Sequence, residues 1–314
     1  MKLKNLKPVF ISIEFILISV VFFSIIGQKE AYAQLYKQAR WEKSYAKTYN
    51  VEANVVYKRV SSDSVMLDVY SLKDKSVLKP VLIFFHGGGW VKGSKDSASQ
   101  FTPYLNSGWA VINAEYRFLQ QAKMPASVED ARCVLAWAYE NAAKYGFDTA
   151  KIVVSGTSAG GHLALIAGMV PPHSELDISC SGNHSMKVAA IVDFYGPTDL
   201  NAFLELENRK KQVKKFYSDI NKAKEIGTLI SPITYVRKGL PPIIMIQGDE
   251  DPTVPYAQSL KLKAALDDAG VRNYLYTVKG GSHGKFSKEE MSDIYKKVSE
   301  FLKTEAGLDF KVKD

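Results

Sequence analysis

Short runs of consecutive apolar residues recur along the chain at fairly regular intervals. A run without alternating polar positions is typical of a β-strand that is buried on both faces. The predicted buried strands are 81–85, 110–114, 151–154, 188–192, 243–246 and, more weakly, 274–278. Two earlier segments, 55–57 and 65–70, flank the turn-forming stretch Ser61-Ser62-Asp63-Ser64, which predicts an antiparallel pair of strands.

Between these runs, apolar residues recur at helical spacing. One helix is predicted over 127–144, where Ser127 and Asp130 have the spacing of an N-terminal capping box. Further helices are predicted over 163–169, 256–269 and 288–303. Strands that alternate with helices predict a mostly parallel central sheet of about eight strands, with helices on both faces. The charged stretch of about 200–240 fits no strand-helix unit, so we expect a small helical cap insertion there.

The N-terminal segment has a different pattern. Lysines precede an apolar run over 15–27, and Ala31-Tyr32-Ala33 follows, an order typical of a secretory signal peptide. We therefore expect cleavage after Ala33, a single catalytic domain over 34–314, and a secreted or periplasmic location. An uncleaved membrane anchor is the alternative. Glu14 and the short apolar run argue against it, because a spanning helix needs about 20 apolar residues, and no stable membrane insertion is expected after cleavage.

Composition and charge narrow the class of protein only slightly. The 314 residues are 46% hydrophobic and 24% charged, as expected for one globular domain. The net charge is +8, and loss of four lysines and two glutamates with residues 1–33 would lower it to +6. A basic run comprises Arg209, Lys210, Lys211, Lys214 and Lys215. It predicts a solvated helix face or, as a sharper alternative, contact with an acidic polysaccharide or another negatively charged substrate.

The sequence contains no motif for binding nucleic acid, a metal ion or a nucleotide phosphate. No aromatic-interleaved basic patch indicates nucleic-acid binding. No His/Cys cluster or H-E-x-x-H motif indicates a metal, and the glycines at 87–89 lack the Gly-Lys-Ser/Thr of a phosphate-binding loop. We therefore expect neither metal nor cofactor. The two cysteines, Cys133 and Cys180, could pair in an oxidising compartment, but the sequence leaves this open.

A motif typical of a catalytic nucleophile, Gly156-Thr157-Ser158-Ala159-Gly160, follows the strand predicted over 151–154. Glycines on both sides of a serine permit a sharp strand-to-helix turn that exposes the hydroxyl at a helix N-terminus. An apolar strand before the motif and a Leu/Ala-rich helix after it are the expected context. Ser158 is therefore the predicted nucleophile.

A second motif, His86-Gly87-Gly88-Gly89-Trp90, directly follows the strand predicted over 81–85. Acyl transfer places negative charge on a former carbonyl oxygen, and N–H donors must already face that position. Glycines let the backbone approach a substrate, so Gly87 and Gly88, together with the Ala159 amide, are the predicted oxyanion hole. His86 and Trp90 are candidates for the substrate pocket.

The base and the acid should lie on loops after later strands. Only His283 of the five histidines follows a candidate acid, and glycines on both sides would let its loop bend toward the nucleophile. Three carboxylates follow the strand predicted over 243–246, and Asp251, before a rigid Pro-x-x-Pro turn, is the preferred acid. Asp249 is second, as a helper or turn-former, and Asp199 is a more distant alternative.

With these motifs the chain resembles the esterase/lipase branch of the α/β-hydrolases related to hormone-sensitive lipase. It is most similar to a bacterial secreted group that includes feruloyl- and acetyl-esterase-like enzymes. The resemblance extends over about 55–302. Its motifs are His86 to Trp90, Glu115-Tyr116-Arg117, Asp130, 156–162, Tyr195-Gly196-Pro197-Thr198-Asp199, 251–255 and 281–284.

The resemblance implies an α/β-hydrolase fold, in which Ser158, His283 and Asp251 form the triad and Asp130 and His162 are structural. Glu115 departs from the family, whose members often have Asn there. The implied activity is hydrolysis of short-chain acyl or aryl esters, with acetyl or feruloyl groups on carbohydrates among the candidates. A peptidase or amidase of the same fold, or a catalytically silent carbohydrate-binding module, are the alternatives. Trp90, Tyr116 and Tyr195 could flank the pocket, although Tyr195 is favoured as a core residue.

Overall fold

The computed structural model describes residues 45–60, 63–97, 99–182, 185–207, 209, 213–217 and 219–312. The chain divides into two compact units, Met1–Lys47 and Thr48–Asp314, and the architecture below is that of the second. The predicted signal peptide and its cleavage site lie outside the described residues. Within the residues that are described, no helix is both long enough and apolar enough to cross a membrane.

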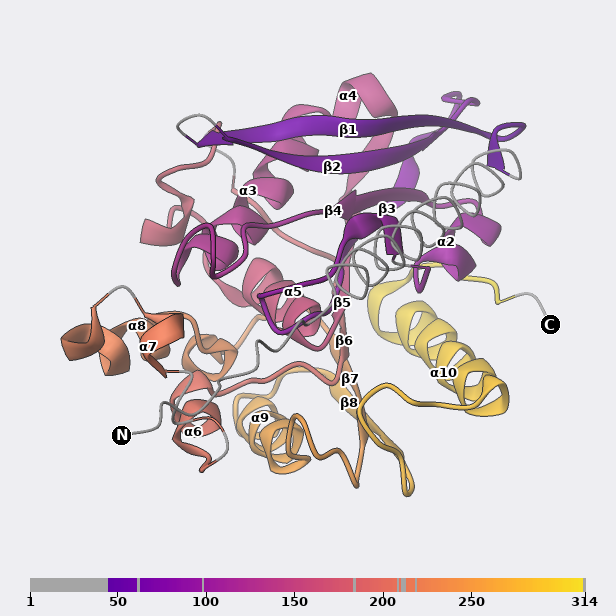
Figure 1. Ribbon diagram of the computed structural model, residues 1–314. Helices are drawn as coiled ribbons and strands as arrows, with labels where there is room; N and C mark the ends of the chain where they lie inside the picture. Colours follow the sequence, from indigo (N-terminus) through magenta and orange to yellow (C-terminus); the bar gives the residue numbers. More distant parts are fainter. Residues whose placement is uncertain are drawn as a thin grey trace, which may run out of the picture. The chain divides into compact units, whose positions relative to one another are not determined.

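A single eight-stranded sheet forms the centre of the second unit (Figure 1), which confirms the predicted fold class. Its strands, in spatial order, are β1 (Tyr49–Val60), β2 (Asp63–Leu72), β4 (Ala110–Ala114), β3 (Lys79–Phe85), β5 (Phe147–Thr157), β6 (Ala190–Phe194), β7 (Ile243–Gly248) and β8 (Asn273–Val278). Strand β2 is antiparallel to both of its neighbours, and all other pairs beyond it are parallel. The sheet is therefore mostly parallel, with the predicted antiparallel pair at one edge.

Helices cover both faces of the sheet. Helices α3 (Ala126–Glu140), α5 (Ala159–Met169) and α9 (Ala257–Asp268) lie on one face, and α2 (Thr102–Asn106) and α10 (Lys288–Ala306) lie on the other (Figure 1). Successive residues of β3 divide between the two layers: Ile83 and Phe85 join the core beneath α3 and α5, whereas Phe84 packs 5.8 Å from Phe101. This double burial explains why the strands are continuously apolar in sequence.

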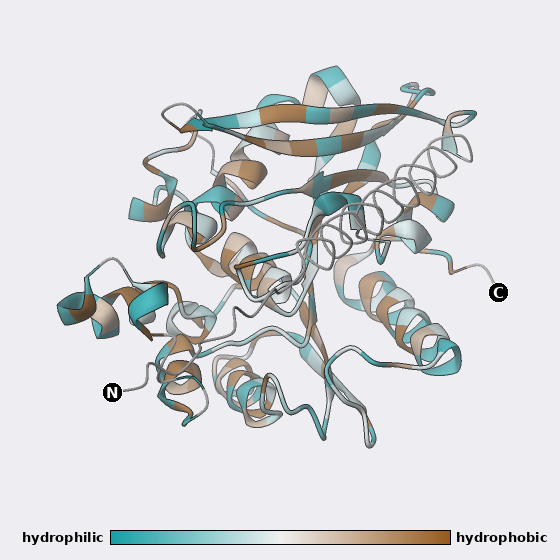
Figure 2. Ribbon diagram, viewed as in Figure 1, coloured by the Kyte–Doolittle hydropathy of each residue, from teal (hydrophilic) through white to brown (hydrophobic). Residues whose placement is uncertain are grey.

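Helix α10 shows how a surface helix of this sheet is specified. Ser287 and Glu290 form a capping box at its start, and Gly307 ends it in a left-handed conformation. Its buried residues recur at helical spacing: Ile294, Tyr295, Val298, Phe301 and Leu302. Apolar and polar residues consequently alternate around this helix in Figure 2.

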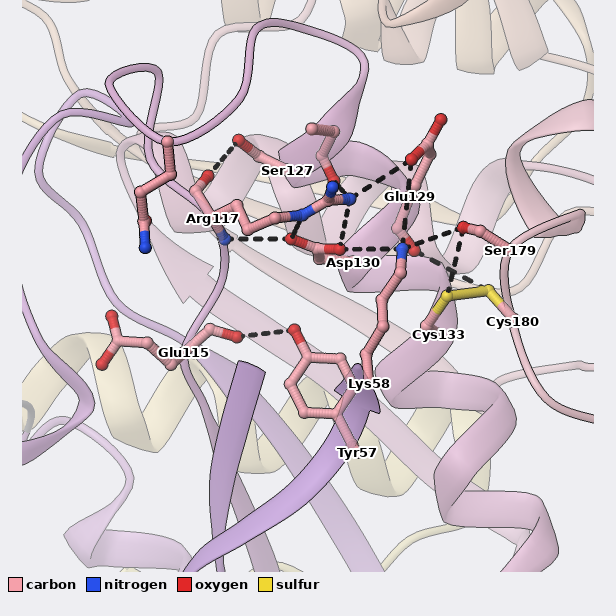
Figure 3. Close-up of polar contacts among 12 residues, drawn as sticks. Tyr57, Lys58, Glu115, Arg117, Ser127, Glu129, Asp130, Cys133, Ser179 and Cys180 are labelled. Carbon is pink, nitrogen blue, oxygen red and sulfur yellow. Dashed lines mark hydrogen bonds and ion pairs between the residues drawn. A yellow bond between two sulfur atoms is a disulfide. The ribbon is translucent and has the colours of Figure 1, made fainter. Parts of the chain in front are cut away.

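Around α3 the sequence-based expectation was wrong in two respects. The helix predicted over 127–144 ends at Glu140, and a separate short helix, α4 (Ala142–Tyr145), follows. The predicted capping box does not form, because α3 begins at Ala126 without a side-chain cap. Asp130 is instead fully buried and binds Lys58 and the backbone and side chain of Arg117 (Figure 3).

A disulfide joins α3 to the loop that follows α5. Cys133 and Cys180 are bonded, with their Cα atoms 4.7 Å apart, which settles the pairing that the sequence left open. The bond holds Ser179 next to Lys58, whose Nζ donates to the Ser179 hydroxyl at 2.8 Å (Figure 3). The loop, β1 and α3 are thus tied together by one covalent bond and one buried group of charges.

The stretch between β6 and β7 consists of short helices. They are α6 (Leu200–Glu205), α7 (Val213–Phe216) and α8 (Ala223–Leu229), with 3₁₀ turns η4 (Ile220–Lys222) and η5 (Pro232–Tyr235). This is the stretch for which the sequence predicted a helical insertion. Phe216 at the end of α7 is buried, and its ring lies 5.1 Å from that of Trp90. The insertion therefore packs against the loop that follows β3.

Candidate active site

Ser158 lies in a sharp turn between β5 and α5. Its backbone adopts φ 56° and ψ −118°, a strained conformation for a residue with a side chain. The turn requires close packing of backbone: a Cβ on Gly160 would lie 2.0 Å from the carbonyl oxygen of Phe85, and one on Gly156 would lie 2.3 Å from that of Gly160. The two glycines thus allow the turn to sit directly against the end of β3, with the serine hydroxyl projecting from it.

His283 and Asp251 complete a line of hydrogen bonds that begins at Ser158. His283, after β8, has its Nε2 atom 2.9 Å from Ser158 Oγ and its Nδ1 atom 2.6 Å from Asp251 Oδ2. An ionised carboxylate only accepts hydrogen bonds, so the ring proton lies on Nδ1. The Nε2 lone pair is then available to the serine hydroxyl, as a general base requires. The structure thus brings together the three residues predicted as a triad.

Asp251, after β7, is held by several donors. Its Oδ1 accepts the N–H groups of Thr253 at 2.7 Å and Val254 at 3.0 Å, and its Oδ2 accepts Gln247 Nε2 at 2.8 Å. Burial alone would raise the pKa of Asp251, but the hydrogen bonds from His283, Val254 and Thr253 hold that pKa below its ordinary value. The carboxylate therefore stays ionised and can stabilise a protonated His283. Gln247 and Thr253 were missed by the sequence analysis, since no motif distinguishes them.

The two alternative acids have other partners. Asp249 Oδ1 accepts the backbone N–H of Gly280 at 2.6 Å, which fastens the loop that leads to His283. Asp199 caps α6 by accepting the N–H of Ala202, and it pairs with Lys261 at 2.6 Å. The former is therefore a turn-former, as the sequence suggested, and the latter a helix cap.

The glycine loop after β3 lies beside the nucleophile. A Cβ on Gly87 would be 3.6 Å from Ser158 Cβ. Gly88 has φ 130°, and a Cβ on it would lie 1.7 Å from the carbonyl oxygen of Lys92. Within the described part of the chain, no hydrogen bond uses the N–H groups of Gly87, Gly88 or Ala159. Three backbone donors near Ser158 are thus available to a ligand, as an oxyanion hole requires.

His86 and Trp90, predicted as pocket residues, are buried and are not among the residues that line the pocket. His86 Nε2 lies 2.6 Å from Glu115 Oε1, and its Nδ1 lies 2.7 Å from the carbonyl oxygen of Gly87. The Tyr116 hydroxyl donates to the carbonyl oxygen of His86. These side chains therefore hold the glycine loop from within, and Glu115, the residue that departs from the family, supplies one of the contacts.

A pocket of about 670 Å³ opens at Ser158. It is lined by Gly87, Gly88, Gly89, Val91, Lys92, Leu119, Thr157, Ser158, Tyr195, Arg209, Lys215, Phe216, Thr253, His283 and Gly284. Contrary to the sequence-based preference for the core, Tyr195 belongs to this wall. Its φ of 48° turns the residue at the end of β6, and its ring lies 4.8 Å from that of His283.

Two buried titratable groups, His162 and Asp193, lie close to the nucleophile: His162 follows Ser158 on α5, and Asp193 is on β6, the strand that pairs with β5. His162 on α5 is fully buried, its Nε2 lies 2.7 Å from the carbonyl oxygen of Ile230, and burial lowers its pKa to about 4. Asp193 on β6 accepts the N–H of Gly196 at 3.0 Å, and burial raises its pKa to about 8. Both groups are therefore neutral near pH 7. Among the residues that the structure describes, no group of His, Cys, Asp and Glu could hold a metal ion.

Comparison with known proteins identifies relatives of the same fold. The BD-FAE family model matches residues 67–266, and the TAP-like protein model matches residues 230–306. Esterase LipQ of Mycobacterium tuberculosis is 29% identical over 255 residues, which are 78% of this chain and 58% of LipQ. Esterase LipC of the same organism is 30% identical over 62% of this chain and 50% of its own length. The chain spans about half the length of the curated relatives that it matches.

Solved structures match over more of their length. A truncated form of a carbohydrate esterase from gut microbiota superposes with a TM-score of 0.68 and 30% identity, covering 81% of this chain and 96% of that one. Esterase 2 of Thermogutta terrifontis superposes with a TM-score of 0.66 and 29% sequence identity, covering 82% of this chain and 92% of that one. That enzyme has also been seen with propionate or butyrate bound and phosphorylated by paraoxon. The chain therefore belongs to the BD-FAE family, within the esterase/lipase group of the α/β-hydrolases.

Proposed function

We propose that the protein is a serine carboxylesterase that hydrolyses short-chain acyl or aryl esters through an acyl-serine intermediate. The observation that carries the proposal is the unbroken line of hydrogen bonds from Asp251 through His283 to Ser158. An adjacent loop whose backbone N–H groups are available to a ligand supports it. The named esterases among the relatives support the same class of reaction.

In the first half of the proposed reaction, Ser158 Oγ attacks the ester carbonyl carbon while its proton passes to His283 Nε2. Negative charge collects on the carbonyl oxygen, where the N–H groups of Gly87, Gly88 and Ala159 receive it. Asp251 stabilises the resulting imidazolium. The C–O bond to the alcohol then breaks, and the proton on Nε2 leaves with the alcohol.

In the second half, water enters the pocket and gives its proton to His283 Nε2 as its oxygen attacks the acyl carbon. The same three N–H groups hold the second oxyanion. Collapse of this intermediate releases the carboxylic acid and returns the proton to Ser158 Oγ. No group outside the described site is needed for either half.

The proposal extends to the natural substrate and to the location of the protein. We take acetyl or feruloyl groups on carbohydrates as the natural esters, because one structural relative is a carbohydrate esterase and the pocket volume suits a ligand of that size. The Thermogutta enzyme with propionate or butyrate bound supports short acyl chains. A secreted or periplasmic location is proposed from the predicted signal peptide alone.

The test is hydrolysis of p-nitrophenyl butyrate by the purified full-length chain and by its Ser158→Ala variant. The proposal predicts a fall in kcat of about 10⁴-fold or more. Ser155→Ala is the matched control, since this hydroxyl lies three residues away and donates to the carbonyl oxygen of Val192 instead of facing the pocket. Equal background rates for wild type and Ser158→Ala would refute the proposal. Assays with p-nitroanilides and carbohydrate ligands would then separate an amidase from a silent binding module.

A further inference from the structure

Among the described residues, the charged side chains that line the pocket are basic. Apart from His283, the basic residues on the described part of the wall are Lys92, Arg209 and Lys215. No Asp or Glu is among the described residues that line the pocket. Asp251, the nearest acid in the mechanism, is buried behind His283 and is already paired with it. An incoming anion would therefore meet positive charge on the wall.

Arg209 occupies a fixed place on this wall. Its Nη2 atom donates to the carbonyl oxygen of Thr253 at 3.2 Å, and its guanidinium lies 4.8 Å from the centre of the Phe203 ring. Thr253 also donates its N–H to Asp251, so the guanidinium is anchored to the loop of the proposed catalytic acid. Burial lowers the pKa of Arg209, but a guanidinium stays charged at any pH at which the enzyme works. A charge that has lost part of its water shell attracts an anion more strongly than an exposed one.

Two lysines from other segments extend the positive wall. Lys92 belongs to the turn that closes over Gly88, and Lys215 is on α7, beside the pocket residue Phe216. Both are exposed. The neighbouring Lys214 is also exposed but does not line the pocket. The basic run in the sequence therefore divides into residues that line the pocket and at least one that does not.

We infer that, among the esters proposed above, the preferred substrates are those that also carry a carboxylate, and that Arg209, with Lys92 and Lys215, binds this group. The inference rests on the proposed esterase function and adds a substrate class to it. A planar guanidinium matches a carboxylate and can bind both of its oxygens, whereas the lysines add longer-range attraction. Neutral esters of the same size would gain nothing from these three charges.

The test uses pairs of probes that differ only in charge. Mono-4-nitrophenyl glutarate and its methyl ester place the charge on the acyl side, and 4-acetoxybenzoate and its methyl ester place it on the alcohol side. We expect kcat/KM to favour the anionic member of at least one pair by about 10-fold, after correction for the rates of alkaline hydrolysis. The preference should shrink severalfold in 0.5 M NaCl, because exposed charges are screened.

Variants assign the preference to residues. Arg209→Gln should lower the anion-to-neutral ratio of kcat/KM by about 5- to 20-fold, and Lys215→Gln by about 2- to 5-fold. The ratio cancels any effect of the substitution that is common to both probes. Lys214→Gln is the matched control on the same helix and should leave the ratio unchanged. A ratio near one in the wild type, or equal ratios in wild type and Arg209→Gln, would overturn the inference while leaving the esterase function intact. Failure of the wild type to hydrolyse the neutral probes as well would overturn the esterase proposal itself.

Discussion

Asp130→Asn removes one negative charge from the buried face of α3 while nearly preserving the shape of the side chain. Asp130 is completely buried and accepts four hydrogen bonds: one from Lys58 Nζ at 2.9 Å and three from Arg117, through its backbone N at 2.9 Å, Nε at 2.8 Å and Nη2 at 2.7 Å. Figure 3 shows the carboxylate between the two cations. In the variant, an amide group replaces one of the two accepting oxygens and faces donors.

The expected cost is large because the cations cannot escape to water. The side chain of Lys58 is 6% exposed and that of Arg117 is 12% exposed. Removing one partner of a buried ion pair leaves an uncompensated charge and costs about 3–5 kcal/mol. Glu129 provides a matched comparison on the same helix. It contacts the same cations at 3.9 and 3.3 Å but is 29% exposed, so Glu129→Gln should cost less than about 1 kcal/mol.

Equilibrium unfolding in urea, followed by circular dichroism, measures both variants against the wild type. A lower midpoint with an unchanged m-value reports a loss of stability without a change in the surface exposed on unfolding. Equal losses of stability in the two variants, or a cost of less than about 1 kcal/mol for Asp130→Asn, would contradict a buried, uncompensated charge. Either result would mean that the buried charges find other partners when the carboxylate is lost.

Three further predictions concern the site, the pH dependence of stability and the disulfide. Asp251→Asn should lower kcat for p-nitrophenyl butyrate by about 10⁴-fold, since the amide favours the wrong tautomer of His283; a loss below 10-fold would contradict the assigned role. Asp193 has its pKa raised in the fold, so it binds a proton that the unfolded chain releases, and its contribution to the stability of the wild type should fall as pH rises from about 4 to about 8. Thermal unfolding across this range should show the free energy of unfolding of Asp193→Asn rising, relative to that of the wild type, by roughly 1.4 kcal/mol per pH unit. Parallel plots of this free energy against pH for the two proteins would disprove the burial of a neutral acid. Replacing both Cys133 and Cys180, 47 residues apart, by serine should cost about 2–4 kcal/mol, and a reductant should then destabilise only the wild type.

The sheet could be predicted because its strands are buried on both faces and therefore stand out as continuous apolar runs. The prediction was less accurate where tertiary packing decides the ends of elements. The segment predicted as 188–192 pairs in register as Ala190–Phe194, and β5 begins at Phe147, before the apolar run. Because neighbouring residues of each strand are buried in different layers of the core, the composition of a strand does not show where it begins or ends.

The three residues predicted as the triad could be found because each lies in a local motif after a strand. The supporting residues could not. Asp130 has the spacing from Ser127 that a capping box would have. Its actual partner Lys58 lies 72 residues earlier in the chain and is brought to it only by the fold. Tyr195 looks like a strand-end core residue, and only its positive φ turns it toward His283. Long-range partners and backbone reversals of this kind carry no signal in one sequence.

The backbone contact between Gly160 and the carbonyl oxygen of Phe85 bears on how such an enzyme changes over time. It fuses the end of β3, the start of α5 and the loop between β3 and β4 into one inflexible block, in which a single added methyl group would separate the nucleophile from the donors beside it. Arg209 and Phe216 come instead from the segment between β6 and β7, which contacts that block through the rings of Phe216 and Trp90. New specificities should therefore arise by rewriting that segment, and libraries for directed evolution would be best confined to it, with the glycines of the block left untouched.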